Sequence, residues 1–137
     1  MRAEKAIKYL LNNAAGVTAL VGSGSAARIY PGQLPQAATL PGLVVEHISG
    51  IELTTIDANS AFGLMQARIQ VTAVCKTYPE VKALLEQVRL ACNYQRGVFN
   101  GVRVVSIIRD SMGPDLRDDD LQLYTQSLDF QVTYQEP

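Results

Sequence analysis

A regular alternation of apolar and polar residues between residues 64 and 75 constrains the fold more than any other feature. The apolar positions are Ala67, Ile69, Val71, Ala73 and Cys75. The polar positions between them are Gln66, Arg68, Gln70 and Thr72. Successive side chains of a strand point to opposite faces, so this pattern predicts a strand with one buried face and one solvated face. The chain must therefore build a sheet.

A second strand is predicted just before this one. Residues 43 to 53 also alternate, although both of their faces carry apolar groups. The turn-forming sequence Asp57-Ala58-Asn59-Ser60 separates the two patterns, which predicts a long antiparallel hairpin whose tip projects beyond the core. Ile56 and Phe62 lie near this tip with no core to join. Because exposed apolar groups of this kind often mark a partner site, we expect both to contact another subunit or another protein.

Two amphipathic patterns predict helices. The first covers residues 3 to 14, and the second starts at a capping box formed by Thr77 and Glu80, has an apolar stripe from Val81 to Cys92 and is closed by Gly97. The second helix should cover the sheet. Residues 102 to 108 and 124 to 134 predict two further strands. The expected fold is therefore α+β in the order α-β-β-α-β-β. Its antiparallel sheet has about four strands in two hairpins, with one helix packed on a face and an N-terminal helix. A chain of 137 residues fits a single domain over residues 1–137.

Three segments are expected to be mobile loops, at about residues 22–27, 55–62 and 110–120. The last is rich in aspartate and contains few large apolar side chains. Ordering this segment in the free subunit would therefore bury little apolar surface to offset the loss of conformational entropy. We expect it to become ordered on docking to a partner. The docking-loop candidates are Asp115, Arg117, Asp118, Asp119 and Asp120.

Charge and composition exclude several classes of protein. Twelve basic and 13 acidic residues, without a basic cluster, argue against a broad cationic surface for nucleic acid. No apolar run approaches the roughly 18 residues of a membrane span, and the N-terminus does not resemble a signal peptide. Charged residues make up 18% of the chain, below the roughly 25% of typical domains, which slightly favours a subunit covered by neighbours. The polar strand face with Gln66, Arg68 and Gln70 is then either solvated surface or a subunit interface.

Catalysis and metal binding have little support in the sequence. His47 is the only histidine and lies in an apolar strand, while Cys75 and Cys92 lack the spacing of a zinc or redox site. The acidic segment lacks the register of a calcium loop, and the Gly/Ser stretch at residues 22–25 lacks the lysine of a phosphate-binding loop. We therefore expect no enzyme activity, no cofactor and no metal. A small enzyme using His47 or Cys75 is the less favoured alternative.

Five segments together resemble the tail-completion or tail-terminator family of long-tailed bacteriophages and prophages. They are GVTALVGS (16–23), RIYPGQLPQAATLP (28–41), ARIQVTAV (67–74), YPEVKALLEQVRLA (78–91) and LYTQSLDFQVTYQ (123–135). They span almost the whole chain in the family's order. The resemblance implies a small α+β subunit that forms a hexameric ring on the last tail-tube ring, stops tube growth and presents the head-joining surface.

The resemblance also implies partners and a location. The partners would be further copies of the chain, the major tail-tube protein and a head-completion or connector protein, with DNA only passing through the ring lumen and no membrane involved. The protein would be assembled in the bacterial host cytoplasm and would lie at the head-proximal end of the virion tail. Tyr30 and Leu34, in the proline-rich segment, join Ile56, Phe62, Gln66, Arg68 and Gln70 as candidates for the subunit or tail-tube interface. A connector ring subunit of the phage neck is the alternative function.

Overall fold

The two alternating segments pair as the predicted antiparallel hairpin in the computed structural model, which describes residues 2–24, 27–35, 39–53 and 63–136. Strand β2 (Gly42–Leu53) runs antiparallel to β3 (Gly63–Cys75), with Leu43 opposite Ala73 and Val45 opposite Val71. Strand β7 (Leu123–Glu136) pairs with the other side of β3, and β5 (Val102–Met112) pairs with β7. Both predicted hairpin pairings, β2 with β3 and β5 with β7, are therefore confirmed.

The prediction of about four strands is wrong, because the sheet has seven among the described residues. The additional strands are β1 (Ile29–Pro31), β4 (Gly97–Phe99) and β6 (Leu116–Asp118). Each is three residues long, too short to show a periodic pattern, and exists because a longer strand pairs with it. The sheet order is β1-β2-β3-β7-β5-β4, with β6 beside β7. Since β1 runs parallel to β2, the sheet is mixed.

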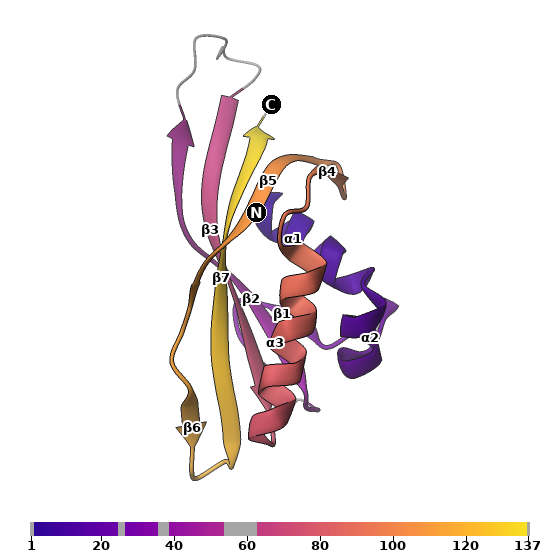
Figure 1. The fold of residues 1–137 in the computed structure, drawn as a ribbon, viewed down its shortest axis with the longest axis vertical. Coiled ribbons are helices and arrows are strands. Elements are labelled where there is room, and N and C mark those ends of the chain that lie inside the picture. The colour runs from indigo at the N-terminus through magenta and orange to yellow at the C-terminus, as the bar shows by residue number, and fades with distance from the viewer. Residues whose placement is uncertain (1, 25–26, 36–38, 54–62, 137) are drawn as a thin grey trace.

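All three helices lie on one face of the strongly curled sheet (Figure 1). Helix α1 (Arg2–Asn12) and the short α2 (Ala15–Val21) precede the sheet, and α3 (Tyr78–Cys92) follows β3. The apolar stripe of α3 predicted the helix correctly, because Val81, Leu84 and Val88 are buried against the strands. The alternating residues Ala67, Ile69 and Val71 belong to the same hydrophobic core as these helix residues. The α+β class is thus confirmed.

Arg28 fixes both ends of the proline-rich segment that joins α2 to β2. Its backbone N–H donates to Val21 O, and its O accepts from the N–H of Leu43. Its guanidinium donates to the carbonyls of Pro41 and Leu20, each at 2.9 Å. A short stretch of chain without regular periodicity is therefore anchored to both the helical layer and the sheet, apart from residues 36–38, which lie outside the described residues.

Strand β5 changes which face its residues present because its register shifts between Val104 and Ser106. Val102 and Val104 are buried on the helix-covered face, and strict alternation would place Ser106 and then Ile108 on that face. The shift instead buries Ile107 and leaves Ile108 52% exposed. A bulge of this kind inserts one residue into a strand and reverses the alternation beyond it.

Candidate assembly surfaces

The polar face of β3 points away from the helices, as the sequence predicted. Gln66, Arg68 and Gln70 are half-buried and alternate with the core residues of the same strand. Thr72 extends this face, and its hydroxyl lies 2.9 Å from that of Ser127 on β7. The uncovered face of β3 and β7 is therefore a polar surface in which side-chain hydrogen bonds connect the two strands.

Arg68 connects three strands on this surface. Its Nε donates to Asp129 Oδ2 on β7 at 2.8 Å, and its Nη2 donates to Ser111 Oγ on β5 at 3.0 Å. The Asp110 carboxylate lies 3.5 Å from Nε. The hydrogen bond to Asp129 raises the pKa of Arg68. Asp129, which sequence reasoning did not single out, is only 8% exposed, so its charge needs this partner.

Tyr30 and Leu34 both contact their own subunit. Tyr30 lies on β1 and lines a cavity of about 100 Å³ between that strand and the N-terminal helix, together with Lys5 and Lys8. Leu34 lies so close to Gly42 that a Cβ there would be 3.3 Å from Leu34 Cδ1. Both side chains are half-buried, so each keeps part of its surface for a partner.

The aspartate-rich segment contains more regular structure than a loop. Residues 110–112 end β5 and residues 116–118 form β6, which pairs with β7, so the expected loop across residues 110–120 is corrected to two strand segments with short connections. We call residues 113–122 the β6 arm. It runs beside the lower part of β7 at the lower end of the molecule (Figure 1). The mobility of the arm in solution stays a prediction.

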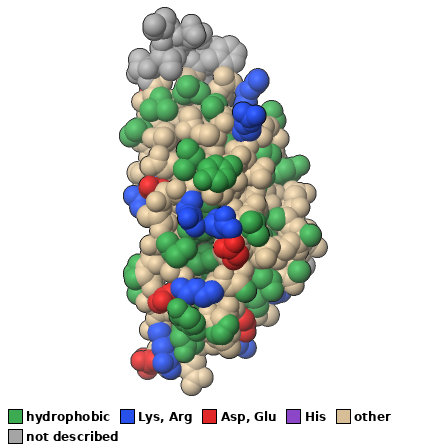
Figure 2. Space-filling view, in the orientation of Figure 1, with side chains coloured by type: hydrophobic (Ala, Val, Ile, Leu, Met, Phe, Trp, Pro, Cys, Tyr) green, Lys and Arg blue, Asp and Glu red, His purple; other side chains and the backbone are tan. Residues whose placement is uncertain are grey.

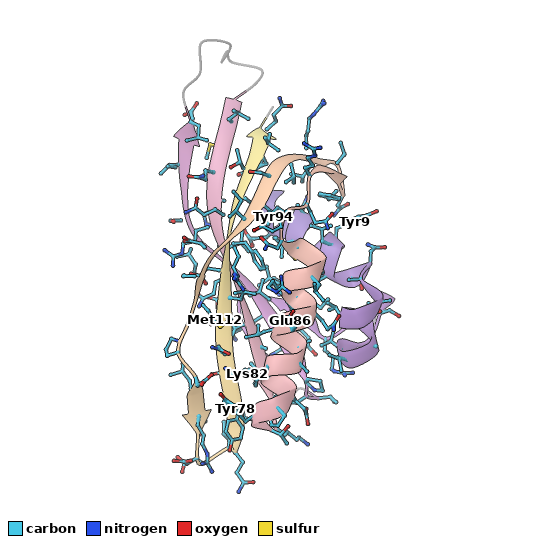
Figure 3. The ribbon with its side chains drawn as sticks, in the orientation of Figure 1. Tyr9, Tyr78, Lys82, Glu86, Tyr94 and Met112 are labelled. Carbon is cyan, nitrogen blue, oxygen red and sulfur yellow. The ribbon has the colours of Figure 1, made fainter. Side chains whose placement is uncertain are left out.

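Lys82 on α3 connects the helix to the β6 arm. Its Nζ lies 2.5 Å from Asp115 Oδ1 and 2.6 Å from Gln126 Oε1, and Tyr78 Oη donates to Asp115 Oδ2 at 3.2 Å. Figure 3 labels Tyr78 and Lys82 along this side of α3. The hydrogen bond from Lys82 lowers the pKa of Asp115, and Asp115 in turn raises that of Lys82. The sequence analysis considered Arg117 as the only cation near these aspartates. It missed Lys82, which is distant from them in the chain.

The tip of the β6 arm is tied locally and remains exposed. Asp118 Oδ1 accepts hydrogen bonds from the backbone N–H groups of Asp120 and Leu121. Arg117 pairs with Asp119 at 2.8 Å and lies over the ring of Tyr124 at 5.4 Å. The arm therefore presents a mostly acidic turn to its surroundings.

The two residues of the enzyme alternative have no catalytic surroundings. Burial raises the pKa of Cys75 to about 12, so its thiol carries almost no thiolate at neutral pH. The exposed ring of His47 lies over Gly50, and no hydrogen-bond or ion-pair partner for it is found in the part of the chain that the structure describes. Among the described residues, neither has an activating neighbour of the kind that nucleophilic catalysis requires.

The described residues lack two further kinds of feature. They contain no group of three or more His, Cys, Asp or Glu side chains placed to hold a metal ion. They also contain no helix long and apolar enough to span a membrane. Ile56 and Phe62, at the predicted hairpin tip, lie outside the described residues, and their role stays a prediction.

The fold matches a chain in a solved structure described as "Virion of native gene transfer agent (GTA) particle". The TM-score is 0.69 at 16% sequence identity, over 97% of this chain and 94% of the other. The molecule thus has the α+β fold of a subunit found in a virion-like particle. A search of curated protein sequences found no matching relative.

The family model described as "Tail completion protein gp17" matches residues 5–135. This match covers nearly the whole chain, so the protein belongs to the tail completion protein gp17 family, as the sequence resemblance predicted. It is a structural protein of the phage tail.

Proposed function

We propose that this protein forms a ring, most simply a hexamer, on the head-proximal end of the tail tube. The ring ends tube polymerisation and presents the surface to which the filled head joins. The observation that carries this proposal is the family match over residues 5–135. The fold similarity to a chain of a gene transfer agent virion supports it, because that chain belongs to an assembled particle.

The physics of identical subunits supports the ring. A head-to-tail contact joins two different surfaces of one chain and closes into a ring when its rotation divides a full turn. In a closed ring, both surfaces of this head-to-tail contact are occupied in every subunit. The ring can therefore cap a tube of fixed symmetry. The major tail-tube protein would bind one side of the ring and a head-completion or connector protein the other.

The balanced charge of the chain supports DNA passage through the lumen without sequence-specific binding. Twelve basic residues against 13 acidic ones provide no excess positive charge to hold a phosphate backbone. The uncovered face with Gln66, Arg68 and Gln70, and the surfaces of Tyr30 and Leu34, are the candidates for subunit or tail-tube contacts. The acidic turn of the β6 arm is the candidate for docking.

Growth of tail tubes from purified tube protein tests the proposal. Electron microscopy would measure tube lengths with and without this protein, and we expect short tubes of uniform end structure when it is present. A strictly monomeric protein that leaves tube length unchanged and does not bind tube ends would contradict the proposal. Binding to portal-bearing heads in the absence of tubes would support a connector instead.

A further inference from the structure

The two edges of the sheet differ in charge, and this difference suits a head-to-tail contact between copies of the chain. The sheet order places β2 and β4 on opposite sides, with β3, β7 and β5 between them. Figure 1 shows the upper part of β2 at the left and β4, with the start of β5, at the right, at similar heights along the molecule. A contact between two surfaces at similar height relates neighbouring copies by a rotation about the long direction of the molecule with little translation along it, and a rotation without translation is the condition for a closed ring.

The first surface is the free edge of β2, residues 46–53. Strand β1 pairs with β2 only at Leu43, Val44 and Val45, so no described strand pairs with the outer side of residues 46–53. An unpaired strand edge is a template for association with another chain. Ile48 and Ile51 are exposed on this segment, Ile51 by 58%.

The free edge of β2 carries negative charge. Glu46 is half-buried and Glu52 is exposed. Neither carboxylate has an ion-pair partner in residues 2–24, 27–35, 39–53 and 63–136. Two other carboxylates of the sheet, those of Asp110 and Asp129, form ion pairs with Arg68 within the subunit.

The second surface, the β4–β5 edge, consists of residues 96–99 and 102–108. Its exposed apolar side chains include Val98, which is 65% exposed, Val105 and Ile108. Arg96 precedes β4 and Arg103 lies on β5, both exposed. Within the described residues, neither guanidinium has an ion-pair partner. Figure 2 shows Lys and Arg side chains beside hydrophobic ones on this side of the molecule.

Part of the β4–β5 edge is closed to strand pairing. Tyr94 N–H donates to Ile107 O at 2.8 Å, and Arg109 N–H donates to Asn93 Oδ1 at 3.0 Å. A partner would therefore meet this side mainly through side chains and the short outer edge of β4. Apolar groups flanked by charges of opposite sign on the two surfaces fit such a contact, because complementary charges set register and exclude wrong pairings.

We propose that, in the ring, the free edge of β2 of one subunit packs against the β4–β5 edge of the next, with Glu46 and Glu52 facing Arg96 and Arg103. The inference rests on the ring of the proposed function and names its subunit interface. The occupant of each surface is a second copy of this chain. The contact is heterologous, so every subunit uses both surfaces once.

Paired charge reversals test the interface. An acid-reversed variant carries Glu46→Lys with Glu52→Lys, and a base-reversed variant carries Arg96→Glu with Arg103→Glu. Each variant alone sets like charges against each other, and we expect the protein concentration for half-maximal ring formation to rise at least tenfold. An equimolar mixture should restore rings of alternating subunits when the ring number is even, and a chain with all four substitutions should restore rings of any number.

Native mass spectrometry of the full chain across a concentration series, with and without tail tubes, would measure assembly. Circular dichroism would establish that each variant is folded. Glu80→Lys and Lys76→Glu are matched controls, because both residues are exposed near the start of α3 and outside the two surfaces. They should assemble like the unaltered protein.

The outcomes distinguish a failure of the proposed interface from a failure of the proposed function. If the unaltered protein forms rings and both folded variants do so at the same concentration, the interface is wrong and the ring stands. If the variants lose assembly but neither the mixture nor the fourfold variant restores it, the pairing of these two surfaces is also wrong. If the unaltered protein neither forms rings nor binds tail tubes, the proposed function fails and the interface fails with it.

Discussion

Two adjacent isoleucines on β5 provide a direct test of the register that the structure assigns. Ile107 is fully buried, whereas Ile108 is 52% exposed on the opposite face. Ile→Ala removes three carbons, worth about 2.4 kcal/mol at about 0.8 kcal/mol per buried methylene, and leaves a cavity that adds to this cost. We therefore expect Ile107→Ala to lower the free energy of unfolding by about 2–5 kcal/mol. Ile108→Ala should change it by less than about 0.5 kcal/mol.

Urea and thermal unfolding followed by circular dichroism would measure both changes. The entropy of unfolding is about 2.1 cal/mol/K per residue, or roughly 0.29 kcal/mol/K for 137 residues, so a loss of 3 kcal/mol lowers Tm by about 10 °C. The unfolding measurements use conditions in which the protein is monomeric, because assembly itself adds stability. Equal destabilisation by the two substitutions, or a larger effect of Ile108→Ala, would refute the register shift between Val104 and Ser106 and the orientation of β5 built on it.

Four further predictions concern the two thiols and the β6 arm. Cys75 and Cys92 should react with a thiol reagent such as DTNB at pH 8 only after unfolding, because burial raises the pKa of both thiols; rapid reaction of the native protein would contradict their burial. Lys82→Gln should speed hydrogen exchange in residues 113–118 relative to the control Lys76→Gln, because it removes the cation that holds Asp115; unchanged exchange would mean that β6 pairing alone orders the arm. The Lys82–Asp115 contact should also weaken as the pH falls through and below 3.8, the ordinary pKa of Asp115, since a lowered pKa stabilises the folded state only while the carboxyl is ionised. Asp119→Asn with Asp120→Asn should reduce binding to tail or head components at low salt and have less effect at high salt, because contacts between exposed charges are screened; equal loss at both salt concentrations would argue against an electrostatic docking role.

Local patterns were sufficient to predict the long elements. Alternation predicted β2, β3, β5 and β7, and helical spacing predicted α1 and α3, because these patterns depend only on which faces of an element are buried. The resemblance carried by segments along the whole chain predicted the family. The face shared by Gln66, Arg68 and Gln70 was also predictable from alternation alone.

Features that depend on contacts between distant residues required the tertiary structure. Strands β1, β4 and β6 exist through pairing with a longer strand, and the bulge that buries Ile107 instead of Ile108 has no local pattern to reveal it. Lys82 neutralises Asp115, and Arg68 neutralises Asp129, across separations of 33 and 61 residues that no local pattern connects. The opposition of the β2 and β4–β5 edges likewise follows from strand order, which is decided when the strands pair. Sequence periodicity determines which face of an element is apolar, whereas its neighbours, its register and its charge partners are determined by packing in three dimensions.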